Sequence, residues 1–291
     1  MEDLIYNVEK KWLKTLFKVC RDTFSDSFLP SHDETHHYRV WTTAIELIRE
    51  LGAQNIYFSE TDIEKILIAV FFHDVGMAKN LNKEHGKISR KICEFFFKAN
   101  PDKKIRDLKE VYEAIENHDN KDYKNNTYHN PDPGRLFSVL CVSDDLDAFG
   151  ITGIYRYAEI YLLRNININD LPEKVLDNLN SRFDYFQKNY GFLTSFSEKQ
   201  EARYLTIKTF YEKLKKQFIS IPYSNKTIHG QSGVIYAIRE YVLDKNLSSE
   251  KASNHILETS KDEYVTWFFT QLIQELRKDH PKTHPILRYQ Y

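Results

Sequence analysis

Long stretches of the chain repeat apolar residues every three or four positions, which is the spacing of a helix with one buried face. Residues 4 to 24 follow this pattern, and they place Leu4, Val8, Trp12, Leu16 and Val19 on one side. Residues 63 to 72 are apolar on nearly every side, which predicts a helix buried all round. No stretch shows a strong strand-like alternation of apolar and polar residues. The pattern therefore predicts an all-α fold.

Polar residues and glycines indicate where these helices begin and end. Ser31 and Glu34 have the spacing of a capping box and predict a helix that runs toward Leu51 and stops at Gly52. Ser59 or Thr61 begins the next helix, which covers the apolar residues 63 to 72. Further helices are predicted over 85–98, 104–118, 135–148, 155–164, 171–190 and 198–218, with an irregular stretch over 120–134.

A candidate linker lies at 220–233, where Pro222 and two glycines interrupt the helical pattern. We therefore expect a main domain over residues 1–219 and a helical C-terminal segment of unknown role over residues 226–291. The stretch from Ile256 to Leu276 has an apolar face that could pack on a second copy, so a homo-oligomer is one expectation.

Composition narrows the choice of partners and compartment. The formal net charge of -1 gives no basic field that would attract nucleic acid or anionic lipid, and both partners are disfavoured. The longest apolar run, Ile66 to Phe72, is too short to cross a bilayer. The start of the chain does not resemble a signal peptide, and three widely spaced cysteines suit a reducing compartment. The expected location is cytoplasmic.

Histidines and acidic residues gather in the first half of the chain. Seven of the 11 histidines lie between residues 32 and 129. His73 and Asp74 follow one buried-looking run, and Asp144 follows another. Taken singly, each has a simpler interpretation: a capping histidine, a surface acid, or a solvated cluster of three acids in four residues. Together they predict a divalent metal site, since imidazole and carboxylate suit Mn, Fe, Co, Ni and Zn.

His36 and His37 both border an apolar stripe, and periodicity does not choose between them.

The order His36, His73-Asp74, Asp144 resembles the HD-domain metal-dependent phosphohydrolase superfamily, and the local contexts match too. The run from Asp33 to Val40 resembles Asp-x-x-His-x-x-Arg-Val, which selects His36 over His37. The run 71–76 resembles apolar-His-Asp-Ile/Val-Gly, and the run 143–153 resembles Ala-Asp-Arg-Leu-Asp-Ala-Ile-Gly-x-x-Gly of one bacterial branch. The resemblance is good from residue 31 to about 160 and looser to about 215.

This resemblance implies an HD-domain-like helical bundle with a helical C-terminal extension, and a metal held by His36, His73, Asp74 and Asp144. The implied reaction is hydrolysis of a phosphate ester or anhydride of a nucleotide or related small metabolite. Asp74 would also be catalytic, because it would hold the attacking water. Candidates for binding the substrate's phosphate are Lys79, Lys121 and Arg156, although each also fits an ordinary surface charge.

Three departures from the family patterns leave the substrate open. Asp145 stands where the bacterial branch commonly has a basic residue. The Glu-Asp pair of the stringent-response hydrolases does not follow His73-Asp74, and the Gly-Tyr-Pro signature of the cyclic-dinucleotide branch is absent from the sequence.

The number of metals depends on two more histidines. With His85 and His118 the sequence resembles the six-ligand arrangement of binuclear members, so the cofactor is one or two divalent ions of Mn, Fe, Co, Ni, Mg or Zn. In the single-metal alternative, His85 caps a helix and His118 binds substrate. The rival function is a metal- or ligand-binding regulatory module without turnover.

Overall fold

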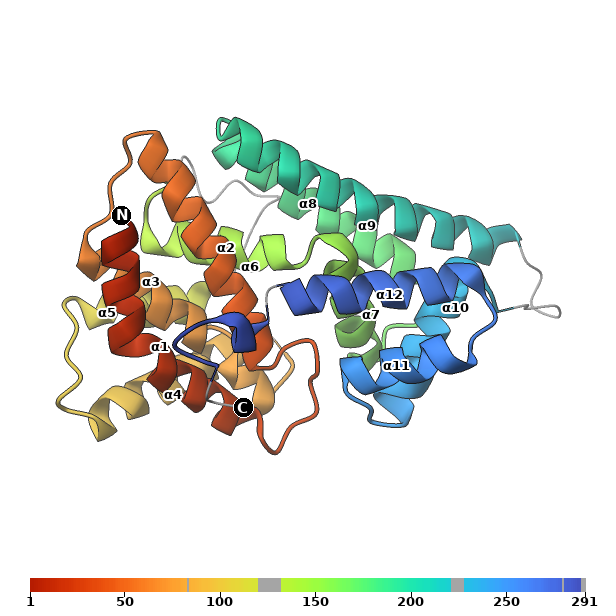
Figure 1. Ribbon diagram of the computed structural model, residues 1–291, viewed down its shortest axis with the longest axis horizontal. Coiled ribbons are helices and arrows are strands. Elements are labelled where there is room, and N and C mark those ends of the chain that lie inside the picture. The colour runs from red at the N-terminus through yellow and green to blue at the C-terminus, as the bar shows by residue number, and fades with distance from the viewer. Residues whose placement is uncertain (83, 120–131, 221–227, 279, 289–291) are drawn as a thin grey trace. The chain divides into compact units, whose positions relative to one another are not determined.

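The computed structural model describes residues 1–82, 84–119, 132–220, 228–278 and 280–288, and these residues form helices and no strands (Figure 1). The α-helices are α1 (Glu2–Phe24), α2 (Glu34–Ala53), α3 (Glu60–Phe72), α4 (His85–Ala99), α5 (Leu108–Asn117), α6 (Leu136–Asp147), α7 (Gly150–Leu163), α8 (Leu171–Tyr190), α9 (Thr194–Ser220), α10 (Gly230–Ala237), α11 (Ser249–Thr259) and α12 (Glu263–Lys278). Short helices of other types are η1 (Val75–Ala78), η2 (Ile238–Asp244) and η3 (Pro281–Thr283). The predicted all-α fold is confirmed.

The chain forms two compact units that interleave along the sequence. Unit 1 contains residues 1–147, 188–196 and the described residues from 280 to 288. Unit 2 contains residues 148–187 and 197–278. These units are defined by how the chain packs, which is a different property from a domain boundary. The predicted domain boundary at residue 219 therefore stays a prediction.

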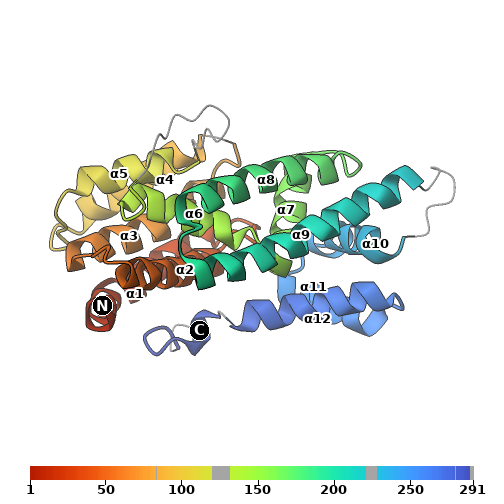
Figure 2. The ribbon, with the colours of Figure 1, turned by 90° about the horizontal axis from the view of Figure 1, so that it is seen from above.

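Helix α3 forms the centre of unit 1. Every residue from Ile63 to Phe72 is buried, as expected for a helix that is apolar on all sides. Figure 2 shows α3 with α1 and α2 on one side and α4 and α5 on the other, and α6 also packs against it. Helix α3 therefore packs against five helices of the same unit.

Capping side chains fix where α2 and α3 begin. Ser59 and Asp62 form a capping box at the start of α3, which decides for Ser59 over Thr61. The predicted cap of α2 was wrong: the carboxylate of Asp33 accepts the N–H of Thr35 at 2.9 Å, and α2 begins at Glu34. The Ser31 hydroxyl contacts the ring of His32 instead.

In unit 2, α7 packs against α12. Phe149 precedes α7 and has no side-chain oxygen to cap it, and the carboxylate of Glu275 on α12 accepts the N–H groups of Ile151 and Thr152. At the other end of α12, Asp262 accepts the N–H of Gly230 and thereby joins the start of α10 to the start of α12. Apolar packing and two carboxylates together hold this unit's helices in place.

Several predicted boundaries differ from those observed. Helix α5 begins at Leu108 rather than 104, because Asp107 adopts a left-handed conformation that a helix cannot include. Helix α7 begins at Gly150 rather than 155. Residues 230–233 of the candidate linker belong to α10, and residues 221–227 lie outside the described residues, as do residues 120–131 of the irregular stretch.

None of the helices in the described part of the chain combines the length and the apolar character that crossing a lipid bilayer requires.

Candidate metal centre

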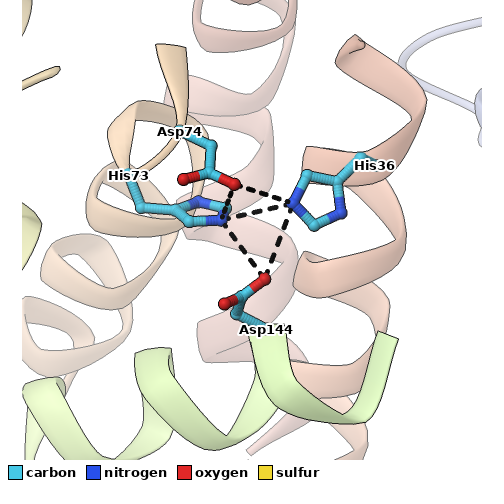
Figure 3. A group of neighbouring side chains, drawn as sticks. All are labelled: His36, His73, Asp74 and Asp144. Atoms are coloured by element: carbon cyan, nitrogen blue, oxygen red, sulfur yellow. Dashed lines mark hydrogen bonds and ion pairs between the residues drawn. The ribbon is translucent and has the colours of Figure 1, made fainter. Parts of the chain in front are cut away.

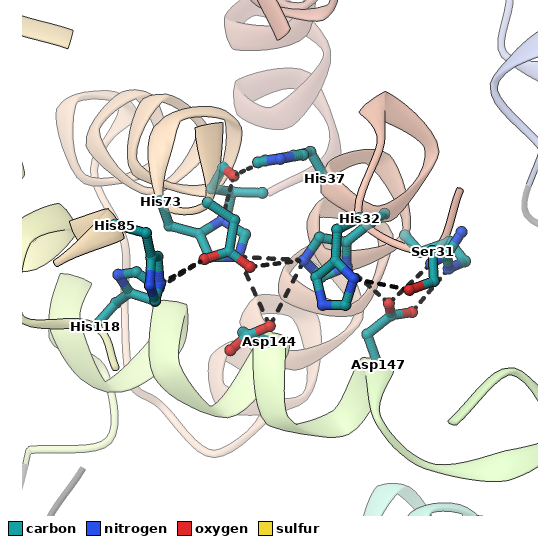
Figure 4. Close-up of polar contacts among 12 residues, drawn as sticks. Ser31, His32, His37, His73, His85, His118, Asp144 and Asp147 are labelled. Atoms are coloured by element: carbon teal, nitrogen blue, oxygen red, sulfur yellow. Dashed lines mark hydrogen bonds and ion pairs between the residues drawn. The ribbon is translucent and has the colours of Figure 1, made fainter. Parts of the chain in front are cut away.

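Five helices of unit 1 bring six ligand-type side chains together near the end of α3. The six residues are His36 in the first turn of α2, His73 and Asp74 directly after α3, His85 at the start of α4, His118 directly after α5, and Asp144 near the end of α6 (Figures 3 and 4). All six are buried. The predicted ligand residues therefore lie in one cluster.

Four of these residues form a first group, which we call the four-ligand group: His36, His73, Asp74 and Asp144 (Figure 3). The Nε2 atoms of His36 and His73 are 3.3 Å apart. Oδ2 of Asp74 lies 3.6 Å from Nε2 of His36 and 3.5 Å from Nε2 of His73. Oδ1 of Asp144 lies 3.7 and 3.6 Å from the same two nitrogens. Two imidazoles and two carboxylates thus point at one space.

A second, three-ligand group contains Asp74, His85 and His118. Here the other carboxylate oxygen of Asp74, Oδ1, lies 2.9 Å from Nε2 of His118 and 3.2 Å from Nε2 of His85. These two nitrogens are 3.2 Å apart. Asp74 is therefore common to both groups and faces each with a different oxygen.

The Nδ1 atoms of the four imidazoles are all engaged away from the cluster. Nδ1 of His73, His85 and His118 each lies 2.7 Å from the backbone carbonyl oxygen three residues earlier, which is that of Val70, Asn82 and Ile115 respectively. Nδ1 of His36 lies 2.8 Å from Oδ2 of Asp147. Since carbonyl and carboxylate oxygens only accept, each Nδ1 carries a hydrogen. Each Nε2 is therefore the ring atom that faces the cluster and that can bind a cation once it carries no proton.

These donors suit metal cations. Neutral imidazole nitrogens and carboxylate oxygens are the usual protein ligands of divalent first-row metals. Donors that are each about 2.1 Å from one cation lie roughly 3.0–3.4 Å apart, close to the separations within both groups. Inward-facing Nε2 atoms at such distances repel one another unless a proton or a metal cation lies between them. Both groups therefore fit the binding of a divalent cation.

The pKa values of the cluster also indicate a demand for positive charge. Burial alone would lower the pKa of His73, but Asp74 and Asp144 outweigh burial and raise it. Burial also opposes protonation of His85, yet the neighbouring Asp74 raises its pKa to about 9. For Asp74, burial would raise the pKa, but His73 and hydrogen bonds from the other three imidazoles hold it well below its ordinary range.

His37 lies beside the cluster without joining either ligand group. Its Nδ1 donates to the Val70 carbonyl oxygen at 2.9 Å, and its ring stacks on Phe71. Burial holds the pKa of His37 well below its ordinary value, so the ring stays neutral. His36 is thus the histidine of this pair whose ring points into the four-ligand group.

The acids at the end of α6 do not face water. Asp144, Asp145 and Asp147 are all buried, so the alternative of a solvated acidic cluster is wrong. Asp147 binds His36 and also Arg39, whose Nε lies 2.9 Å from Oδ1 of Asp147. The sequence motifs alone indicate no role for Arg39 or Asp147. One signal in the sequence could have indicated a role. Arg39 lies three residues after His36, and Asp147 lies three residues after Asp144, so each shares a helical face with a ligand residue.

The three candidate phosphate-binding residues have different structural settings where they are described. Lys79 is exposed at the turn after η1. Lys121 lies outside the described residues. Arg156 is buried in α7 of unit 2. Their role in binding a phosphate stays a prediction.

The comparison with known protein families matches one part of the chain. The family model of the HD domain matches residues 34–148, a range that contains both ligand groups. This part of the chain is an HD domain, and the resemblance seen in the sequence is confirmed. At the level of the superfamily, HD domains are domains of metal-dependent phosphohydrolases. No curated protein and no solved structure matches the chain.

Proposed function

We propose that the protein hydrolyses a phosphate ester or anhydride with the help of two divalent cations, one in each ligand group. The observation that carries this proposal is the position of Asp74, which presents Oδ2 to the four-ligand group and Oδ1 to the three-ligand group. A carboxylate with this arrangement suits a bridge between two cations. The alternative of His85 as a helix cap is less well supported, since its Nε2 lies within 3.2 Å of Asp74.

The charge of the cluster favours an anionic substrate. The two ligand groups contain two carboxylates, Asp74 and Asp144, and four imidazoles. Two divalent cations would leave a net charge of about +2 among the ligands, which complements a phosphate dianion. Divalent cations at such a site lower the pKa of a coordinated water and polarise a phosphoryl oxygen.

The protein's own residues would supply position and proton control. The Nδ1 hydrogen bonds fix each ring so that Nε2 faces the other ligand residues. Asp74 would orient the attacking water from its shared position. We further propose a nucleotide or related small metabolite as the substrate, with Lys79, Lys121 and Arg156 as candidates for neutralising its remaining charge.

Metal analysis combined with a hydrolysis screen tests this function. The purified protein is loaded with Mn²⁺, its metal content is measured, and an aryl phosphate, a bis-aryl phosphodiester and a panel of nucleotides are offered as substrates. We expect two metal ions per chain and turnover of at least one phosphate compound. His73→Ala should abolish turnover, whereas His255→Ala, at an exposed position of α11, should not.

Two results would contradict the proposal in different ways. One metal ion per chain under saturating Mn²⁺, unchanged by His85→Ala, would remove the second cation and leave a single-metal hydrolase. Retention of metal without turnover of any phosphate compound would contradict hydrolysis itself and favour a regulatory module.

A further inference from the structure

At Nδ1, three of the four ligand imidazoles are held by backbone carbonyl oxygens, whereas His36 is held by a carboxylate. His73 and His118 follow the last residue of a helix, where carbonyl oxygens lack helical partners and can accept from Nδ1. His36 lies in the first turn of α2, where the free backbone groups are N–H donors. Its acceptor must therefore come from another element, and Asp147 of α6 provides it.

Asp147 is itself fixed by a two-point ion pair. Nε of Arg39 lies 2.9 Å from Oδ1 of Asp147, and Nη2 lies 3.1 Å from Oδ2. Arg39 and Asp147 are 7% and 3% exposed, so the pair is shielded from water. A planar guanidinium that meets both oxygens of a carboxylate fixes its orientation as well as its charge.

The spacing of these residues links two metal ligands to one ion pair. On α2 the ligand His36 precedes Arg39 by three residues, and on α6 the ligand Asp144 precedes Asp147 by three residues. Residues three apart lie on the same side of a helix, and α2 packs against α6. Figure 4 shows Asp147 on the opposite side of His73 from His85 and His118. The pair thus lies beside the four-ligand group and contacts its ligand His36.

We propose that Arg39 and Asp147 are positioning residues that set the metal affinity of the four-ligand group through His36. Asp147 fixes the hydrogen of His36 on Nδ1 and the orientation of the ring, while Arg39 balances the buried charge of Asp147. His36 therefore receives a carboxylate acceptor without an added net charge beside the metal ligands. This inference rests on the metal-binding part of the proposed function.

A purely structural ion pair between α2 and α6 is the competing explanation, and metal affinity separates the two. We would measure the dissociation constant of Mn²⁺ by calorimetric titration, and the absorption spectrum of bound Co²⁺, for Asp147→Asn, Asp147→Ala, Arg39→Lys and Arg39→Met. The His85→Ala background isolates the four-ligand group. Lys65→Met is the matched control, because it removes another ion pair of unit 1, that between Lys65 and Glu110.

We expect Asp147→Ala to weaken Mn²⁺ binding by about 10- to 100-fold and to change the Co²⁺ spectrum. Arg39→Met should also weaken Mn²⁺ binding. In a chain that already carries Asp147→Ala, Arg39→Met should weaken Mn²⁺ binding little further, because Arg39 acts through Asp147. Lys65→Met should leave both metal readouts unchanged. If a variant with Ala or Met does not fold, Asp147→Asn and Arg39→Lys carry the same comparison.

Unchanged affinity and an unchanged Co²⁺ spectrum in the folded Asp147 and Arg39 variants would overturn this inference, even if their melting temperatures fell. Failure of the proposed function is recognised separately, because the unaltered protein would then bind no metal or turn over no phosphate compound.

Discussion

At the residue scale, the two adjacent histidines of α2 have opposite surroundings. The ring of His36 meets His73, Asp74 and Asp144 through Nε2. His37 is enclosed by the aromatic rings of Phe24 and Phe71. Neighbouring positions on a helix point about 100° apart, so adjacent residues of the same type can serve a metal site and a core.

This difference predicts opposite results for two substitutions. His36→Ala removes a ligand nitrogen and should reduce metal retention and activity by at least about 100-fold. His37→Phe should keep the bound metal and lose about 1 kcal/mol of stability, because the Val70 carbonyl oxygen still accepts from His73. Metal content and thermal unfolding of both variants provide the measurement. Metal lost from His37→Phe but kept by His36→Ala would place the ligand at the other histidine.

At the element scale, the three-ligand group depends on close approach of backbones. An added Cβ at Gly86 would lie 2.5 Å from the carbonyl oxygen of Glu116, and one at Gly76 would lie 2.1 Å from that of His85. These glycines allow α4 to lie directly against η1 and α5. His85 reaches Asp74 and His118 because of this contact.

Gly86→Ala should therefore affect one ligand group and spare the other. The added methyl group of the alanine must push α4 away from α5, which should cost about 1–3 kcal/mol of stability. The same movement should withdraw His85 from the cluster. We expect metal content to fall from two ions to one. Gly52→Ala is the control, since its Cβ would meet only Met1 at 3.4 Å. Two ions in Gly86→Ala would show that α4 does not need this contact.

A second prediction at this scale concerns Asp262 of unit 2. Its carboxylate accepts the N–H groups of Gly230, Tyr264 and Val265 at 2.7, 2.8 and 2.9 Å. Burial would raise its pKa, but these donors outweigh burial and lower the pKa below its ordinary value. Asp262→Ala should cost about 1 kcal/mol, as judged by denaturant unfolding.

The lowered pKa of Asp262 also sets the direction in which the protein's stability changes with pH. The unfolded chain binds a proton at Asp262 more readily than the folded protein does, so this residue's contribution is present above about pH 4 and is lost as the pH falls through the folded pKa. Asp262→Asn retains an oxygen acceptor and cannot ionise, so its stability should depend less on pH in this range. Equal pH dependence in the two proteins would contradict the assignment.

At the scale of the whole molecule, unit 1 is assembled from three separate stretches of chain. Its last stretch contacts the first two helices: Nε2 of His284 lies 3.3 Å from Oε2 of Glu9, and the His284 ring meets that of Tyr38 edge-on. Leu287 of this stretch is completely buried. The end of the described chain is therefore part of the core of unit 1.

A substitution at Leu287 tests this contribution. Leu287→Ala leaves a cavity and should lower stability by about 2–5 kcal/mol, while the six ligands remain in the chain. Truncation after residue 278 should cost at least as much. Leu205→Ala is the control, because Leu205 is 48% exposed. Thermal unfolding that is unaffected by Leu287→Ala would show that this stretch contributes no stability.

The sequence predicted much of the site because ligand residues follow helices with clear apolar patterns. His73 and Asp74 follow the buried residues of α3, and Asp144 lies at the end of the equally apolar α6. Helix starts were harder to predict, because Ser31 and Asp33 are both residue types that cap helices. Asp33 caps α2, whereas the Ser31 hydroxyl contacts His32. Arg39 and Asp147 were missed because their partners are more than 100 residues apart in sequence.

The division of unit 1 has a consequence for synthesis on the ribosome. All six ligand residues have been synthesised by Asp144, yet the unit still lacks residues 188–196 and 280–288. The first of these stretches follows the first part of unit 2, and the second follows all of unit 2. The nascent chain therefore presents the histidines and carboxylates for a long period before the unit can close. We therefore expect metal capture before chain completion to increase when translation is slowed or when free metal is abundant.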